Sequence, residues 1–377
     1  MLLPPAHVPL VQSDQVRSDP AFLRILDDFG GSLVVTAAPG QAICLGAEDR
    51  KLTVSATRIV GPFGVAFDGA RLALTARRSV EVYALSRRLA SSYPAATGCY
   101  DAICVPIGSW RTGECMLREI RLDGPSIVAA NTNFSCISRT DMRASFEPLW
   151  RPPFISALMP EDRCHLNSFA TDAQGRVRFV TAFAETDTHR GYRNVPLDSG
   201  VIIDVIHDTT IAKGLGMPHS VRLYDDALYV LDSATGSLWR MNLETRAGVA
   251  MAHLPGFTRG MCRIGDSLIV GISPMRDTAQ VLNLPVFAAK ADFKAALAAI
   301  DIHTGQVQGM LRLPDTIVEI LDIGIVPTVR RLHIQNPAAD NLVAIETPSA
   351  VYWLRSEDPG VVPIPGTLDS ENFIRET

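Results

Sequence analysis

The sequence predicts an all-β protein, a β-propeller of six or seven blades with a short N-terminal arm and helix. Short apolar runs alternate with Gly, Asp and Pro turns about every ten residues, a pattern typical of a sandwich, barrel or propeller. One strand–turn–strand unit then recurs along the chain, which favours the propeller. No change in composition marks a second domain. We therefore expect residues 1–29 to form the arm and helix, and residues 30–377 to form a single propeller domain.

One helix is expected, over residues 20–29. Pro20 suits the first turn of a helix, and the pair Gly30 and Gly31 ends it. Residues 1–19 are polar and rich in proline, so we expect an arm there. The chain starts with no basic leader or apolar run of signal length, and no later run approaches about 18 apolar residues. We therefore expect neither a signal peptide nor a membrane-spanning segment.

The repeat is clearest over residues 220–243, which read as strand, Asp turn, strand, Thr-Gly turn and strand. The units that resemble it are 64–74 with 80–85, 119–136, 166–183, and 260–272 with 298–313, while 32–45 supplies the second and third strands of one more. Such a small meander cannot bury both faces alone, and radial stacking of several meanders solves that problem. We expect the two chain ends to combine to close the ring, and residues 143–162 to form an ordered insertion.

Composition narrows the choice of partner. Hydrophobic residues make up 47% of the chain, enough for a large core, and the net charge is −5. The basic residues form scattered pairs and no stripe, so we expect neither nucleic acid nor a membrane surface as a partner. The seven cysteines are odd in number and lack paired CxxC spacing. Reduced thiols in a cytoplasm are therefore expected.

The register of the repeats predicts a site. In a propeller, the first strand of each blade lines the central channel, and the residue before it lies at one mouth. The residues at this position are Gly64, Arg118, His165, His219, Arg259 and Glu319. Two histidines, two arginines and a carboxylate are thus expected to meet around one axis. His189 lies beside Arg190 and Arg193, and these three residues suggest a loop over one mouth.

This set supports several kinds of chemistry. His165 and His219 can act as general acid or base, and Glu319 joins them as a catalytic candidate. The same three residues can instead hold a divalent metal, although Arg118 would repel a cation. Arg118 and Arg259 can clamp a carboxylate or phosphate, and Arg276, Asn167 and Arg222 are further ligand-binding candidates.

Structural roles remain open for two of these residues. Arg259 could be pinned to a loop carbonyl, and Glu319 could pair with Arg118 or Arg259 in a buried network. For the histidines we expect that alanine substitution leaves the melting temperature nearly unchanged, because a side chain at a channel mouth contributes little packing.

Seven stretches resemble a bacterial family of conserved hypothetical propellers, a domain of unknown function sometimes fused to tetratricopeptide repeats. They are residues 131–136, 150–156, 161–167, 185–187 with 191–193, 217–220, 255–260 and 271–276. The resemblance implies a propeller in the cytoplasm and singles out His165, His219, Arg259 and Arg276, but implies no activity. This chain departs from the family where Arg118 stands in place of a histidine and Val318 in place of a glutamine.

Two functions from different classes fit these residues. The first is an enzyme, with lyase- or hydrolase-like chemistry on a small anionic molecule or peptide. The second is a non-catalytic propeller whose channel binds a ligand, or whose rim binds a protein partner. The sequence has no G-x-G-x-x-G, no phosphate-binding GK[ST] loop, no HExxH and no G-x-S-x-G, so no nucleotide cofactor is expected. Fold alone does not decide between the two, because propellers host both.

Overall fold

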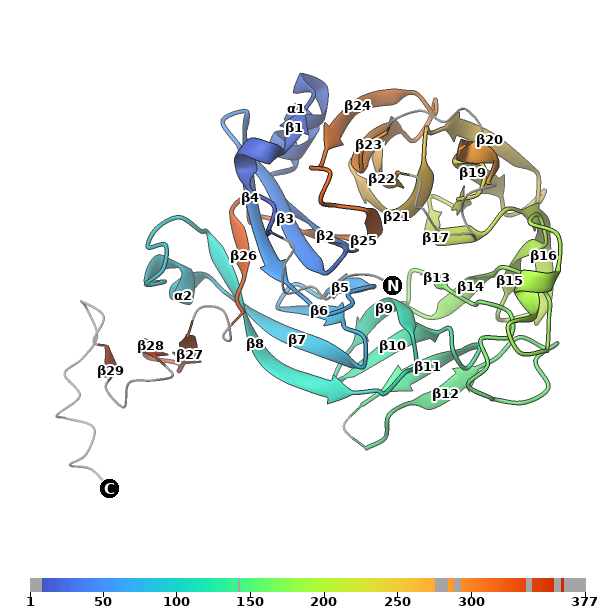
Figure 1. Cartoon of the computed structure of the whole chain (residues 1–377), viewed down its shortest axis with the longest axis horizontal. Coiled ribbons are helices and arrows are strands. Elements are labelled where there is room, and N and C mark those ends of the chain that lie inside the picture. Colours follow the sequence, from blue (N-terminus) through green and yellow to red (C-terminus); the bar gives the residue numbers. More distant parts are fainter. Residues whose placement is uncertain are drawn as a thin grey trace.

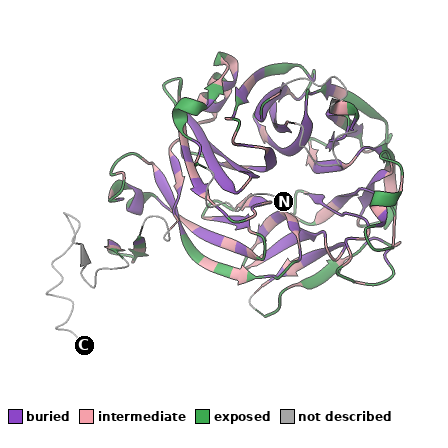
Figure 2. Ribbon diagram, in the orientation of Figure 1, coloured by how far each residue is buried: buried purple, intermediate pink, exposed green. Residues whose placement is uncertain are grey.

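The computed structural model is a ring of six β-sheets around a central axis (Figure 1). It describes residues 9–141, 143–274, 284–287, 293–336, 341–355 and 361–362. Within these residues the sheets form six blades, which confirms the predicted β-propeller and settles the blade number at six. Figure 2 shows that burial is greatest on the inner and middle strands, whereas the outer strands face solvent.

Three blades are built from consecutive strands, as the repeats predict. Blade 3 consists of β9 (Leu117–Asp123), β10 (Ser126–Asn131), β11 (Cys136–Thr140) and β12 (Glu147–Trp150). Blade 4 consists of β13 (Ser168–Thr171), β14 (Val177–Ala182), β15 (Gly200–Asp204) and β16 (Thr209–Leu215). Blade 5 consists of β17 (Pro218–Tyr224), β18 (Ala227–Asp232), β19 (Ser237–Asn242) and β20 (Gly248–His253). Every pairing within these blades is antiparallel.

Blade 1 closes the ring by joining distant parts of the chain. Its inner strand, β25 (Glu319–Val326), pairs antiparallel with β2 (Ser32–Ala38), and the sheet continues through β3 (Gln41–Glu48) and β4 (Lys51–Arg58). The register runs from Ser32 opposite Val326 to Ala38 opposite Glu319. This confirms that residues 32–45 supply the second and third strands of a blade and that segments from both ends of the propeller close the ring.

Blades 2 and 6 each carry a fifth strand at the outer edge. Blade 2 contains β5 (Val65–Phe67), β6 (Arg71–Thr75), β7 (Ser79–Ser86) and β8 (Ala102–Arg111), with β26 (Leu332–Ile334) added parallel to β8. Blade 6 contains β21 (Phe257–Ile264), β22 (Ser267–Ser273), β23 (Ala296–Asp301) and β24 (Val307–Arg312), with β1 (Arg17–Ser18) from the arm added to β24. These additions cover edges that would otherwise expose unpaired backbone groups.

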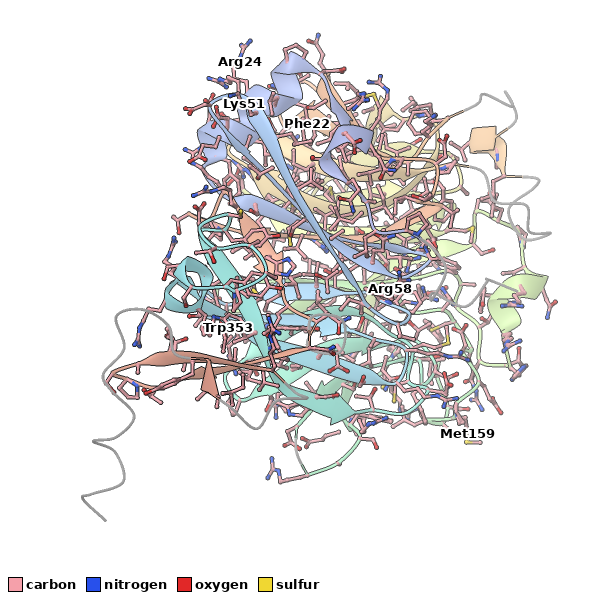
Figure 3. The ribbon with its side chains drawn as sticks, turned by 60° about the vertical axis from the view of Figure 1, so that its left-hand side comes forward. Phe22, Arg24, Lys51, Arg58, Met159 and Trp353 are labelled. Atoms are coloured by element: carbon pink, nitrogen blue, oxygen red, sulfur yellow. The ribbon has the colours of Figure 1, made fainter. Side chains whose placement is uncertain are left out.

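The helix α1 (Pro20–Phe29) has the predicted bounds. Pro20 occupies its first turn, and Gly30 ends it in the left-handed region at φ 67°. Phe22 and Leu26 lie four residues apart on one face and are buried against blades 1 and 6. Figure 3 shows Phe22 directed toward the sheets and Arg24 directed away from them. The helix is therefore anchored by one apolar face.

Two parts of the chain differ from the sequence prediction. Residues 143–162 were expected to be an insertion, but 147–150 form β12, the outer strand of blade 3. This strand was missed because its residues are mostly exposed and carry no apolar alternation. A small sheet, β27 (Leu342–Glu346), β28 (Val351–Arg355) and β29 (Val361–Val362), lies outside the ring. Trp353 packs from it (Figure 3) against α2 (Arg87–Ser91) and β8.

The remaining regular elements are short 3₁₀ turns at Ser13–Gln15, Gly191–Asn194 and Pro285–Phe287. Over the residues described, no helix combines the length and the apolar character that crossing a membrane requires. All seven cysteines are free thiols, and six of them are buried.

Ring closure predicts a stability difference between two identical substitutions. Val35 in β2 is fully buried, whereas Val249 in β20 is 58% exposed. Val35→Ala removes two buried carbons beside the closing strand pair and is expected to cost about 2 kcal/mol, against about 0.5 kcal/mol or less for Val249→Ala. Urea unfolding followed by tryptophan fluorescence measures both. Equal shifts of the midpoint would show that the closing blade contributes no special stability.

Candidate functional site

A cavity of about 370 Å³ lies where the inner strands begin, and we call it the mouth cavity. Its lining includes Arg118, His165, His219, Arg259 and Glu319, five of the six residues that the repeat register selected. The sixth, Gly64, precedes β5, and its neighbour Phe63 lines the cavity instead. The structure thus brings together side chains from five different blades.

Strained backbone surrounds the mouth cavity. Five non-glycine residues that line it have φ between 47° and 55°, in the left-handed region: Met116, Asp162, His165, Arg190 and Met217. Such conformations are uncommon for residues with a side chain and persist only where the surrounding structure fixes them. Their concentration at one cavity is typical of a functional site.

His165 is held by a carboxylate that is itself held by a tyrosine. The imidazole Nδ1 lies 2.9 Å from Asp162 Oδ2, and the Tyr192 hydroxyl donates to the same oxygen at 3.0 Å. The imidazole also packs against the rings of Phe183 and Tyr192, with centroids 4.3 and 4.7 Å away. Because Asp162 accepts from Nδ1–H, the other nitrogen, Nε2, keeps its lone pair in the neutral ring.

His219 has the same tautomer for a different reason. Its Nδ1 lies 2.9 Å from the Met217 carbonyl oxygen and 2.8 Å from Ser233 Oγ. Ser233 donates its own proton to the Thr258 carbonyl at 2.6 Å, so it accepts from the imidazole. Both acceptors therefore fix the proton on Nδ1 and leave Nε2 as the acceptor. The Phe183 ring packs against both imidazoles, with its centroid 5.2 Å from that of His219 and 4.3 Å from that of His165.

Burial keeps both imidazoles neutral. It lowers the pKa of His165 below 6.5, although Asp162 opposes the shift. Burial also lowers the pKa of His219 well below 6.5, and the nearby positive charges of Arg259 and Arg118 add to this shift. At neutral pH each ring is thus a proton acceptor.

Arg259 is paired within the cavity wall. Its Nη1 lies 3.2 Å from Glu319 Oε1, and both residues are buried. Burial lowers the pKa of Arg259 to about 10. The Phe63 ring extends toward two guanidinium groups, with its centroid 4.2 Å from Arg118 Cζ and 5.7 Å from Arg259 Cζ. The ion pair that the sequence left open for Glu319 is therefore formed with Arg259.

The set proposed for a metal is not assembled. Glu319 forms an ion pair with Arg259. Among the residues that the structure describes, no three His, Cys, Asp or Glu side chains are grouped to hold a metal ion. The mouth cavity therefore presents guanidinium groups and neutral imidazoles as its principal polar features.

The other two described ligand-binding candidates are engaged by the protein itself. Asn167 Nδ2 donates to the carbonyl oxygens of His165 and Pro218, at 3.2 and 3.0 Å. Arg222 lies deeper in the channel, with Nη1 2.6 Å from Glu119 and Nη2 3.7 Å from Asp322. Burial raises the pKa of Glu119 to about 7. The remaining candidate, Arg276, lies outside the described residues.

Sequence reasoning missed the partners that give the site its chemistry. Asp162 stands three residues before His165, and this short spacing was the one available signal. Tyr192, Arg190 and Arg193 come from the long connection between β14 and β15, and all three line the mouth cavity. The loop over the mouth was thus expected, but the hydrogen bond from Tyr192 to Asp162 depends on tertiary packing.

The expectation that the histidines contribute little packing is wrong. His165 is 8% exposed and His219 is 5% exposed, and each contacts two aromatic rings. The sequence places both at a channel mouth but does not show that Phe183, Tyr192 and Phe257 surround them. Alanine at either position would therefore remove buried contacts.

Comparison with known proteins identifies a family and a fold. A model described as "Domain of unknown function (DUF4915)" matches residues 20–334, in line with the resemblance seen in the sequence. A chain of the nidogen/laminin complex is similar in structure, with a TM-score of 0.53 and 15% identity, over 79% of this chain and 99% of that one. A protein of unknown function from Bacteroides caccae has a TM-score of 0.50 and 11% identity over the same shares. At these identities the likeness shows the fold alone, and no curated protein matches the chain.

The neutral state of His219 predicts a pH-dependent stability. The unfolded chain binds a proton at this residue near pH 6.5 and the folded chain does not, so folding stability falls as the pH drops below about 6.5. His219→Asn keeps a donor for the Met217 carbonyl and removes the titration. Urea unfolding at pH 7.5 and pH 5 should show a smaller acid loss in the variant, by up to about 2 kcal/mol. The control is His303→Asn, on an exposed outer turn, which should lose as much stability between pH 7.5 and pH 5 as the wild-type protein. Equal losses of stability in all three proteins would contradict a buried neutral His219.

The buried charges beneath the cavity predict a second stability effect. Arg222→Met leaves Glu119 and Asp322 buried without their principal counter-ion, which is expected to cost about 3–5 kcal/mol. The control is Arg312→Met, whose ion pair with Asp19 is nearly half exposed and should cost about 1 kcal/mol or less. Denaturant midpoints compare the two. A loss at Arg222 no larger than at Arg312 would show that the network is solvated.

Proposed function

The chain belongs to the family described as a domain of unknown function (DUF4915), and we propose that it is an enzyme acting on a small anionic molecule or peptide in the mouth cavity. The reaction is lyase- or hydrolase-like, and His165 is its general base. The single observation that carries this proposal is the hydrogen-bonded chain from Tyr192 through Asp162 to His165. A carboxylate behind an imidazole fixes the tautomer and stabilises the cation that forms when the ring takes a proton.

The charge of the cavity supports an anionic ligand. Among the described residues that line it, four guanidinium groups outnumber two carboxylates: Arg118, Arg190, Arg193 and Arg259 against Asp162 and Glu319. Asp162 is engaged by His165, and Glu319 by Arg259. Guanidinium groups bind carboxylate and phosphate oxygens through forked hydrogen bonds. A small anion would therefore be attracted into the cavity and oriented beside the base.

Proton transfer is the step that this geometry serves. In a lyase-like reaction, His165 Nε2 takes a proton from a carbon next to the anionic group, and the bond to the leaving group breaks. In a hydrolase-like reaction it takes the proton from the attacking water. In both, the imidazolium is stabilised by Asp162 and returns the proton to the leaving group, so protons balance over the cycle. His219 presents a second acceptor nitrogen, and Glu319 keeps Arg259 in place.

A non-catalytic ligand-binding propeller is the second candidate, because the same positive cavity would serve binding alone. We further propose a bacterial cytoplasm as the compartment, since the seven free thiols suit a reducing environment. Neither nucleic acid nor a membrane is part of the proposal, and a protein partner at the rim is compatible with it.

The experiment uses two histidines that are held alike. His165 and His207 each donate from Nδ1 to the carboxylate of the residue three positions earlier, but His207 is 63% exposed on the outside of blade 4. Calorimetry with a panel of small carboxylates and phosphates identifies ligands, and NMR of the mixtures detects products. His165→Gln is expected to lower turnover by about 10²- to 10⁴-fold, while His207→Gln leaves it unchanged.

The outcomes separate the two candidate functions. Asp162→Asn should also lower turnover, since the amide no longer stabilises the imidazolium. Circular dichroism confirms that each variant is folded before turnover is compared. Tight binding without any product would favour the binding propeller. If no anion binds the folded wild-type protein, both candidates are wrong.

A further inference from the structure

The guanidinium groups of the mouth cavity lie at two levels. Arg118 and Arg259 come from the inner strands β9 and β21, and we call them the floor pair; they also line the smaller cavity directly beneath. Arg190 and Arg193 come from the connection between β14 and β15, are exposed, and form the rim pair. We propose that the ligand carries two anionic groups, one bound by the floor pair and the other by the rim pair. This inference rests on the proposed function and names its substrate class.

The rim pair lacks the counter-charges that other arginines of the region have. Arg163, in the segment before β13, pairs with Glu161 at 2.8 Å and with Asp187 of the same connection at 2.7 Å. Within the described part of the chain, Arg190 and Arg193 form no ion pair with a carboxylate. Two exposed guanidinium groups that line the mouth of a cavity and form no ion pair with a carboxylate of the described residues are suited to an anion from solution.

The rim pair is also fixed in place. Arg190 has a left-handed backbone at φ 48°, and its N–H donates to the Glu161 carbonyl at 3.0 Å, which ties the connection to the segment before His165. A Cβ on Gly191 would lie 2.6 Å from Thr188 Oγ1, so a larger residue in this turn would have to displace that side chain. The backbone that carries the rim pair is therefore held next to the segment that carries His165.

The rim is connected to the base by hydrogen bonds. Arg193 Nε donates to the Tyr192 hydroxyl at 3.1 Å, and that hydroxyl donates to the Asp162 oxygen that holds His165. An anionic group bound by Arg193 would therefore lie at one end of a series of hydrogen bonds that ends at the proposed base, His165. The second anionic group of the ligand would orient Tyr192 as well as add affinity, so its loss should lower kcat as well as raise KM.

The size of the cavity limits the ligand. A volume of about 370 Å³ is at the small end of the range for ligand pockets. A short chain with an anion at each end fits this volume, either a dicarboxylate or a carboxylate that carries a phosphate. The oxygens of a planar carboxylate and of a tetrahedral phosphate both accept paired hydrogen bonds from a guanidinium group.

Calorimetry of the full chain tests the inference with three probes: succinate, its monomethyl ester and phosphoglycolate. The wild-type protein is expected to bind at least one of the two dianions about tenfold more tightly than the ester, the value of one additional charge-assisted contact. Whichever dianion is preferred identifies the source of the second anionic group. The double variant Arg190→Gln, Arg193→Gln should lose this preference and keep the affinity for the ester within about twofold.

The control is Arg151→Gln, an exposed arginine after β12 that does not line the cavity. It should keep the wild-type preference for the dianion. If wild type and the double variant bind dianion and ester alike, the two-level inference is overturned and the proposed function stands. If neither dianion nor ester binds any of the proteins, and the wild-type protein neither binds nor turns over any anion of the panel, the proposed function itself is wrong.

Discussion

The pairing of β25 with β2 is the contact on which the rest of the molecule depends. Blades 2 to 6 each take their four core strands from one continuous stretch, but blade 1 takes its inner strand from residues 319–326 and its other strands from residues 32–58. Without this ladder the first and last blades would expose unpaired edges and their buried faces. The same ladder sets the position of Glu319, the first residue of β25, and hence the ion pair that holds Arg259 at the cavity.

Closure also explains why the site draws on nearly the whole chain. Each inner strand begins at the same end of the channel, so residues separated by 40 or more positions meet there without any local sequence motif. Residues at the starts of these strands have left-handed backbone conformations, which are strained. This strain accompanies the turn of each segment into the channel. A rigid ring can hold such conformations because every blade is packed between two neighbours.

The sequence predicts where each inner strand begins, because the blades repeat with a spacing that turns and apolar runs reveal. The helix over residues 20–29, the half-blade at 32–45 and the gathering of Arg118, His165 and Arg259 all follow from that period. The sequence does not predict features that lie outside this repeat. Tyr192 lies in an irregular connection, β12 is mostly exposed, and the sheet of Trp353 is outside the repeat. These features are decided by tertiary packing, which leaves no regular spacing in the chain.

Burial acts on two groups of the mouth cavity in the same direction but leaves them in different charge states at neutral pH. Burial lowers the pKa of both His219 and Arg259, because removal from water penalises the charged form of each. The guanidinium pKa falls from its ordinary value only to about 10, so Arg259 remains charged at neutral pH. The imidazole pKa falls well below 6.5, so His219 is neutral there. The carboxylates of Asp322 and Glu119, deeper in the channel, favour the charged arginine further. A desolvated channel therefore produces a fixed positive charge beside neutral proton acceptors, which is the combination that binding an anion and removing its proton requires.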